Sequence, residues 1–174
     1  MTRAAPSLKS KALAAIAQRE HSRAELARKL RAWIGRRRRS LAEAAAATRA
    51  SAAVAAPVPV TSEAEIEPLL DWLAQRDLLS AERFVESRVN VRATRFGNLR
   101  IQQELSQHGL QLDPDVAQTL KASEFDRARN VWSKRFAEPP ADAAARAKQQ
   151  RFLAARGFSS EVVRRVVGGR GDDE

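Results

Sequence analysis

The chain has 174 residues, a formal net charge of +10 and no cysteine, which excludes a disulfide framework and a thiolate metal site. Ala, Leu, Arg, Glu and Gln dominate, Tyr is absent, and Gly and Pro number 7 each, so helix formers far outnumber strand formers and an all-α fold is expected. No apolar run approaches the roughly 18 residues of a membrane-spanning helix, so we expect a cytoplasmic protein without membrane contact.

The first 34 residues are predicted to contain two helices, over residues 8–19 and 22–33, that meet at an abrupt break. The apolar positions at helical spacing are Leu8, Ala12 and Ile16 in the first helix and Leu26, Leu30 and Trp33 in the second. Ser22 followed three positions later by Glu25 is typical of a capping box, in which both side chains satisfy free N–H groups at a helix start. We therefore expect a corner at His21 and a structural role for that histidine.

Residues 35–61 interrupt this pattern with a low-complexity Ala/Arg insertion. The insertion offers few large apolar groups to a core, so a flexible or partly helical linker is expected. Its run of four arginines is either a phosphate contact or a solvated group of charges. A third helix over residues 62–79 completes the first repeat, and Pro68 requires that this helix either starts near Glu67 or is kinked early.

Residues 80–122 are predicted to form a second three-helix repeat. Its helices start at the capping signals Ser80, Gly97-Asn98 and Asp113-Pro114. Its predicted buried positions are Phe84 and Val91, Ile101 and Leu105, and Val116 and Leu120. Gly109 is expected to end the middle helix in a left-handed conformation.

Residues 123–168 are predicted to form a third repeat, followed by a disordered tail over residues 169–174. Its helices are expected over residues 126–136, 142–156 and 160–167. Gly157 is expected to end the middle helix as Gly109 does in the second repeat.

The second and third repeats match residue by residue at a separation of 48. The stretch RIQQELSQHGL aligns with AKQQRFLAARGF, which places Leu105 over Leu153, Gly109 over Gly157 and Leu110 over Phe158. Leu30 falls in register 75 residues before Leu105, and the excess over 48 corresponds to the insertion. The sequence therefore predicts three tandem three-helix repeats that form an elongated or curved helical array.

Positive charge is concentrated in segments. Residues 1–50 carry 13 basic and 3 acidic side chains, whereas residues 63–86 carry 2 basic and 7 acidic ones. Such a field attracts polyanions or acidic protein surfaces. The alternative is that a compositional bias toward arginine, 25 Arg against 6 Lys, leaves much of this charge merely solvated.

A basic stripe in the second repeat is the candidate partner-binding site. Arg88, Arg92 and Arg95 follow i, i+4, i+7 spacing, and Arg100 begins the next predicted helix. Arginine can hold carboxylates or phosphates through two parallel hydrogen bonds, so the stripe suits an acidic groove or a nucleic-acid backbone. The alternative is a plain solvated face opposite the predicted buried positions.

Residues that carry chemistry are scarce. With two His, no Cys and no Tyr, the chain offers few candidates for a nucleophile, a general base or a metal ligand. His108 lies near a helix end, and Asp113 with Asp115 is explained by a helix cap and a first-turn acid. We therefore predict no enzyme activity, catalytic residue, metal or cofactor.

Four motifs in order along the chain resemble the RecX family of bacterial regulatory proteins. They are REHSRAELARKL, EIEPLLDWLAQRDLLSAERFVESRV, RFGNLRIQQELSQHGL and QQRFLAARGFSSEVVRRVV. The family's basic, glycine-containing motif in the second unit corresponds here to Arg88, Arg95, Gly97 and Arg100. The long insertion departs from the family's short turn, and Ile34 stands where a helix-ending glycine is usual.

This resemblance implies a non-enzymatic protein that binds in the groove of the RecA recombinase filament and modulates, mainly inhibits, its ATPase, recombination and coprotease activities. We expect the partner of Arg88, Arg92, Arg95 and Arg100 to be either the RecA filament or single- or double-stranded DNA, and we expect a monomer. Two other hypotheses stay open: a DNA-binding protein that uses its three-helix units as helix-turn-helix readers, and a helical scaffold for an unrelated partner.

Overall fold

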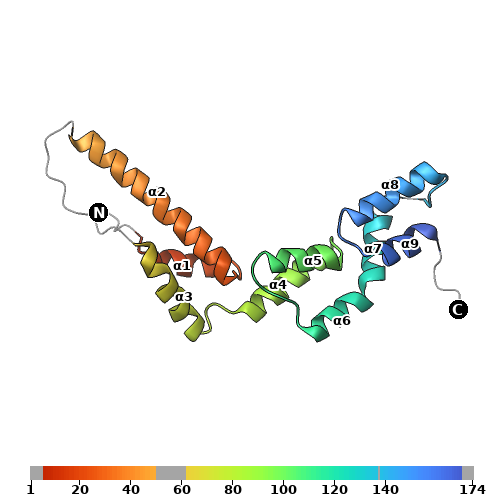
Figure 1. Cartoon of the computed structure of the whole chain (residues 1–174), viewed down its shortest axis with the longest axis horizontal. Coiled ribbons are helices and arrows are strands. Elements are labelled where there is room, and N and C mark those ends of the chain that lie inside the picture. Colours follow the sequence, from red (N-terminus) through yellow and green to blue (C-terminus); the bar gives the residue numbers. More distant parts are fainter. Residues whose placement is uncertain (1–5, 50–61, 137, 170–174) are drawn as a thin grey trace. The chain divides into compact units, whose positions relative to one another are not determined.

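The computed structural model describes residues 6–49, 62–136 and 138–169, and within these ranges its regular elements are all helices (Figure 1). In chain order they are α1 (Leu8–Ile16), α2 (Arg23–Arg49), a short 3-10 helix (Glu63–Glu65), α3 (Ile66–Gln75), α4 (Ala81–Ala93), α5 (Asn98–Ser106), α6 (Pro114–Ala122), α7 (Glu124–Ser133), α8 (Ala143–Ala154) and α9 (Ser160–Gly168). The chain divides into two compact units, Met1–Phe84 and Val85–Glu174. The all-α prediction is confirmed for the described residues.

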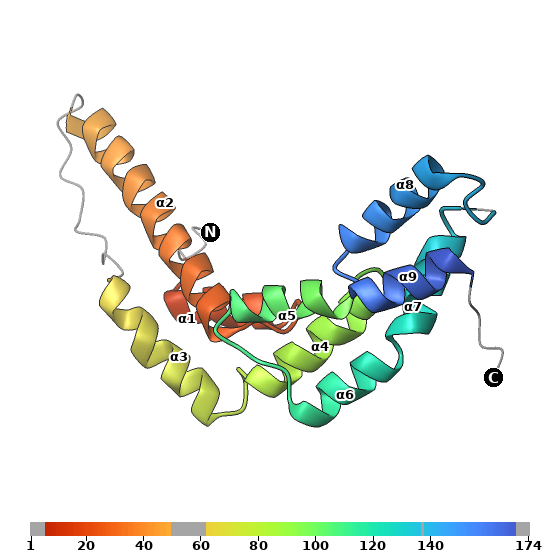
Figure 2. The same ribbon diagram turned by 45° about the vertical axis from the view of Figure 1, so that its right-hand side comes forward.

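Each unit has an apolar core built by helices that are neighbours in sequence. In the first unit α2 packs on α1 and α3, and in the second α9 packs on α7 and α8 (Figure 2). The first core includes Leu8, Leu26, Leu30, Leu70 and Leu73, and the second includes Ala128, Leu153, Phe158, Val163 and Val167. The helices α4, α5 and α6 come between α1–α3 and α7–α9 in the chain, so the described helices follow one another in sets of three. The prediction of tandem three-helix repeats is therefore confirmed.

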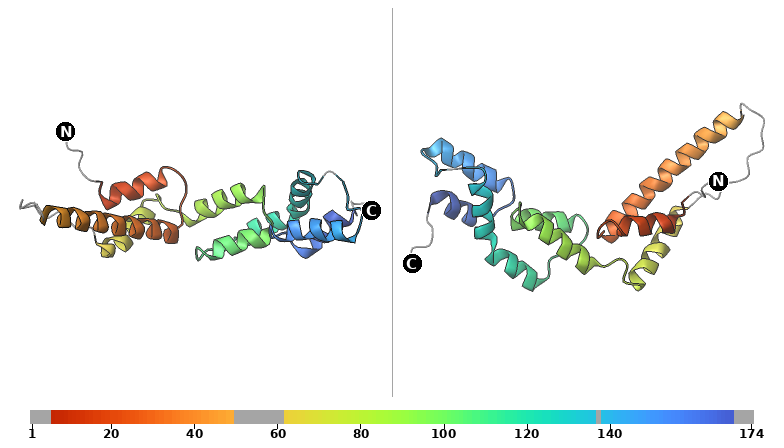
Figure 3. Two further views of the ribbon diagram at one scale, coloured as in Figure 1. Left: turned by 90° about the horizontal axis from the view of Figure 1, so that it is seen from above. Right: turned by 180° about the vertical axis from the view of Figure 1, so that it is seen from behind.

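The helix α2 extends well past its predicted end at residue 33 (Figure 3). Ile34 is buried, because it continues the apolar stripe by which α2 faces the core. Beyond it, Ala, Arg and Glu are strong helix formers, so the chain stays helical to Arg49, and the side chains of residues 35–46 are exposed or only partly buried. Residues 50–61 of the predicted insertion and residues 170–174 of the predicted tail lie outside the described residues.

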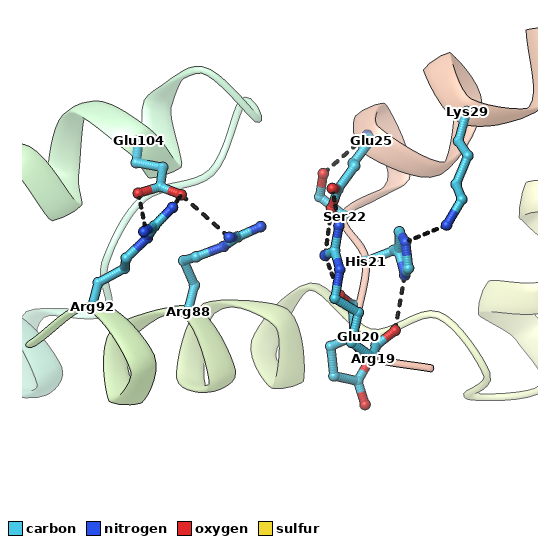
Figure 4. Close-up of polar contacts among 9 residues, drawn as sticks. All are labelled: Arg19, Glu20, His21, Ser22, Glu25, Lys29, Arg88, Arg92 and Glu104. Atoms are coloured by element: carbon cyan, nitrogen blue, oxygen red, sulfur yellow. Dashed lines mark hydrogen bonds and ion pairs between the residues drawn. The ribbon is translucent and has the colours of Figure 1, made fainter. Parts of the chain in front are cut away.

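The corner between α1 and α2 lies at the predicted break (Figure 4). The Ser22 hydroxyl accepts a hydrogen bond from the Glu25 N–H at 3.1 Å, and the Ser22 carbonyl accepts from the Leu26 N–H at 2.9 Å. The Glu25 carboxylate in turn pairs with the Arg19 guanidinium. Ser22 therefore caps α2, as its sequence context predicts.

His21 is fully buried in this corner. Its Nδ1–H donates to the Arg19 carbonyl at 2.8 Å, which leaves Nε2 to accept from the Lys29 ammonium at 3.4 Å (Figure 4). This arrangement requires a neutral ring, because a carbonyl only accepts and an ammonium only donates. Burial lowers the pKa of His21, and the hydrogen bond to the Arg19 carbonyl opposes this effect only partly.

Acid is expected to destabilise the first unit through His21. An unfolded histidine titrates near pH 6.5, whereas the folded pKa of His21 is lower, so the unfolded chain binds more protons in the interval between the two values. The stability contribution is complete above about pH 6.5 and is lost as the pH falls toward the folded pKa. Urea unfolding at about pH 7.5 and about pH 5.5 measures the loss. The variant His21→Gln should remove this pH dependence and His108→Gln should keep it; the opposite pattern would contradict the assignment.

Pro68 lies in the first turn of α3. Before this helix, the Ser62 hydroxyl accepts from the Ala64 N–H at 3.2 Å, and the Glu65 carboxylate accepts from the Ser62 N–H at 2.8 Å. This capping box starts a 3-10 turn that leads into α3 at Ile66. In the first turn of an α-helix the N–H groups have no intrahelical acceptor, so a proline there removes no hydrogen bond.

The second unit confirms the predicted 48-residue register in detail. Leu105 and Leu153 are 1% and 0% exposed, and each carbonyl accepts from the residue five positions later, Leu110 at 3.1 Å and Phe158 at 3.4 Å. Gly109 and Gly157 have φ angles of +71° and +78°, the left-handed conformation that closes a helix. Leu30, the third residue of the register, is likewise buried in the first unit.

Candidate partner-binding surface

The four arginines of the predicted site lie along one stretch of the second unit. Arg88 and Arg92 come from α4, Arg95 follows in the turn after that helix, and Arg100 lies in the first turn of α5. Two of the four, Arg88 and Arg92, have a carboxylate partner among the described residues, and the other two do not.

Arg88 and Arg92 converge on Glu104 of α5 (Figure 4). The Arg88 Nη1 atom lies 3.3 Å from one carboxylate oxygen of Glu104, and the Arg92 Nε atom lies 2.9 Å from the other. All three side chains are at most about one third exposed, so the pairs are less screened than surface ion pairs. Glu104 is the single acid between residues 87 and 112, and this is the sequence signal that could have identified it.

Arg95 and Arg100 remain exposed to solvent. Among the described residues, neither guanidinium forms an ion pair. The guanidinium carbons of Arg92 and Arg100 are 5.5 and 5.9 Å from the centroid of the Phe96 ring. At these distances the cation–π attraction is weak, so it leaves the charge of Arg100 available to a partner, whereas Arg92 is paired with Glu104.

Two large apolar side chains are exposed next to these arginines in sequence. Val91 is 64% exposed and Leu99 is 57% exposed. The prediction that Val91 faces the core is therefore wrong: the arginines that reach Glu104 occupy the face of α4 turned toward α5, and Val89 is buried instead. Val116 of α6, also predicted to be buried, is 37% exposed.

A buried carboxylate that the sequence analysis missed joins the second and third repeats. Glu124, the first residue of α7, is 3% exposed. Its two oxygens accept hydrogen bonds from the Asn98 N–H and from the Ser159 hydroxyl, both at 2.9 Å. Its partners are 26 and 35 residues away, so no local pattern reveals its role.

Arg127, one turn later, donates to the ends of two other helices. Its guanidinium bonds the carbonyls of Ala93, Phe96 and Leu120 and the side chains of Asn98 and Ser123. Burial lowers the pKa of Arg127, and the charge of nearby Glu124 opposes that shift. The two residues thus form a polar hub between α5, α6, α7 and α9.

Two glycines allow the second and third repeats to approach through their backbones. Gly97 donates to the Arg156 carbonyl at 2.9 Å, and Leu99 donates to the Gly157 carbonyl at 3.1 Å. A Cβ atom on Gly97 would lie 2.2 Å from the Gly157 oxygen, far inside any real contact. Only glycine fits at this contact.

A groove of about 850 Å³ opens beside this hub, and Leu99, Lys121, Phe125 and Arg165 are among its lining residues. In the part of the chain that the structure describes, no cluster of three or more His, Asp or Glu side chains is suited to hold a metal ion. No helix there is long and apolar enough to cross a membrane.

Comparison with known proteins gives matches of two kinds. A sequence model of a family described as RecX, third three-helix domain, matches residues 122–167. The chain is also similar to proteins named Regulatory protein RecX over nearly its whole length. The protein from Ralstonia nicotianae is 46% identical over 165 residues, which cover 94% of this chain and 87% of the relative. The protein from Leptothrix cholodnii is 45% identical over 163 residues, with coverage of 92% and 87%, and that from Pseudomonas entomophila is 39% identical over 160 residues, with coverage of 89% and 86%.

Proposed function

The chain belongs to the RecX family of regulatory proteins, and from this premise we propose that it binds the RecA recombinase filament and modulates, mainly inhibits, its ATPase, recombination and coprotease activities. The family membership supports a regulatory role, since the relatives are named as regulators. It acts by binding rather than by catalysis, in keeping with the scarcity of nucleophiles, general bases and metal ligands in the sequence.

The exposed basic and apolar side chains around the α4–α5 turn carry the proposal that the partner is a protein. Arg95 and Arg100 present charge to solvent, and Val91 and Leu99 present apolar area beside them in sequence. Protein interfaces combine an apolar centre with arginine, whereas a phosphate backbone is held by charge alone and does not need the apolar groups. This combination favours an acidic protein surface as the partner of the second repeat.

The mechanism is steric and electrostatic. Helical repeats that bridge neighbouring RecA subunits hinder the conformational changes that accompany ATP turnover, and they block access for DNA or for a repressor substrate. Each contact is weak by itself, but contacts linked in one chain reinforce one another through their effective concentration.

The basic run in α2 supports a second candidate function, direct DNA binding. Arg36, Arg38 and Arg39 are exposed, and among the described residues none of them has an acidic partner. Arg37 is engaged internally, since it donates to the Pro6 carbonyl at 2.8 Å and lies 5.3 Å from the Trp33 ring centroid. Exposed arginines on one helix can contact the phosphates of a DNA backbone. The DNA-binding hypothesis requires such contacts.

Charge reversal separates the two candidates. The double variant Arg95→Glu/Arg100→Glu is expected to raise the concentration needed for half-inhibition of RecA ATPase about tenfold, because it places like charges against an acidic surface. Its thermal midpoint should barely change, since exposed charges contribute little to folding. Arg92 is left intact because its reversal would also break the contact with Glu104.

The matched control reverses the same number of charges in the basic run of α2. Arg36→Glu/Arg39→Glu should leave inhibition of RecA within about twofold of the wild type. If DNA binding is the primary activity, this control instead weakens binding to naked DNA and lowers its dependence on salt, because fewer counterions are released. Unchanged inhibition by the Arg95/Arg100 variant would remove these residues from the proposed RecA contact.

A further inference from the structure

The N-terminus of α5 has no side-chain cap of its own, because its N-cap residue is Gly97. Three consecutive N–H groups at this end donate to the third repeat instead: Gly97 to the Arg156 carbonyl at 2.9 Å, Asn98 to the Glu124 carboxylate at 2.9 Å, and Leu99 to the Gly157 carbonyl at 3.1 Å. The first N–H groups of a helix have no intrahelical acceptor, so the third repeat completes α5.

The end of α4 is held from the same side. The Arg127 guanidinium donates to the Ala93 carbonyl at 3.2 Å, to the Phe96 carbonyl at 2.9 Å and to the Asn98 side chain at 2.5 Å. The whole turn from residue 93 to residue 100 is therefore fixed by groups of the third repeat, and this turn carries both Arg95 and Arg100.

Gly157 lies so close to the backbone of Arg100 that no side chain fits at residue 157. A Cβ atom on Gly157 would lie 2.5 Å from the Arg100 backbone nitrogen and 2.6 Å from the Arg100 Cβ. Contacts this short do not occur, so a side chain at residue 157 must push the first turn of α5 away. Gly109, which has the same left-handed conformation and the equivalent place in the second repeat, has nothing within 4 Å of such a Cβ atom.

We infer that the third repeat positions the partner-binding arginines of the second repeat: Glu124, Arg127 and Gly157 fix the 93–100 turn, so that Arg95 and Arg100 are held in place before the partner arrives. These three are positioning residues, because they act through the turn. The inference rests on the proposed function. A binding surface that is already ordered loses little conformational entropy when the partner binds. If that order is lost, association weakens even though every contacting arginine is still present.

The test compares Gly157→Ala with Gly109→Ala. Both changes impose the same backbone strain, since both glycines are left-handed, but only the first displaces Arg100. We expect Gly157→Ala to raise the half-inhibitory concentration against RecA ATPase about tenfold and Gly109→Ala to change it less than about twofold. Hydrogen exchange at Gly97, Asn98 and Leu99 should accelerate in Gly157→Ala alone. Equal inhibition curves, or equal exchange rates, for the two variants would overturn the inference.

A milder pair covers the case in which Gly157→Ala fails to fold. Ser159→Ala removes one hydrogen bond that orients Glu124 and is expected to weaken inhibition about threefold. Ser160→Ala, its exposed neighbour, should have no effect, and identical curves for this pair would count against positioning.

Different results would refute the proposed RecA function and the positioning of the arginines by the third repeat. If the Arg95/Arg100 reversal weakens inhibition as expected while the variants at residues 157 and 159 behave as wild type, only the positioning is refuted. If the wild-type protein neither binds RecA filaments nor changes their ATPase activity, the proposed function is refuted and the inference with it.

Discussion

Truncation of Leu105 or Leu153 to Ala is expected to destabilise the second unit by about 2 to 5 kcal/mol. Both side chains are at most 1% exposed and occupy equivalent places one helical turn before a left-handed glycine. Loss of either side chain removes apolar burial and leaves a cavity that the short helices around it cannot fill completely. Urea unfolding followed by circular dichroism gives the free energy of unfolding, and hydrogen exchange of α4–α9 locates the effect in the second unit.

The control for this prediction lies on the same helix. Leu99 is the same residue type on α5 but is 57% exposed, so Leu99→Ala should change the free energy of unfolding by no more than about 0.5 kcal/mol. A small effect at Leu105 together with a large one at Leu153 would mean that the register does not describe equivalent environments.

The repeat fold could be predicted because its signals are local. A glycine that ends a helix and a serine or aspartate that starts one act within a few residues, so Gly109, Gly157, Ser22 and Asp113 could be assigned from their immediate neighbours. Matching signals at a fixed separation then reveal the repeat. The end of α2 is the exception, because the Ala- and Arg-rich segment after residue 34 has high helix propensity without any apolar stripe to place it.

The candidate site was less predictable because its contacts join residues far apart in sequence. Helical spacing placed Arg88 and Arg92 on the same side as Arg95, but it could not show that Glu104 of the next helix holds them. The contacts with Glu104 and the burial of Val89 show which face of α4 is turned inward, and Val91 lies outside that face although its hydropathy predicted a core position. Glu124 and Arg127 carry no local signal, since a charged residue in a helix is usually solvated.

Replacement of Arg127 by Ala is the second large effect that we expect, a loss of about 3 kcal/mol in the free energy of unfolding of the second unit. A hydrogen bond from a charged donor contributes about 1.5 to 3 kcal/mol, and here the guanidinium donates to part-buried carbonyls near the ends of α4 and α6. The change also removes a positive charge that interacts with the buried Glu124 carboxylate. Chemical denaturation of the purified variant measures the loss.

Arg127→Lys separates the geometry of the guanidinium from its charge. An ammonium restores a positive charge near Glu124, but it has three donors on one nitrogen and cannot reach carbonyls of two helices and the Asn98 side chain together. We therefore expect Lys to recover less than half of the stability lost in Arg127→Ala. Full recovery by Lys would show that charge alone matters, and the hydrogen bonds to the 93–100 turn would then contribute little to holding that turn. An intermediate value with accelerated exchange at the Asn98 amide is the result expected if the planar fork of Arg127 connects the second and third repeats.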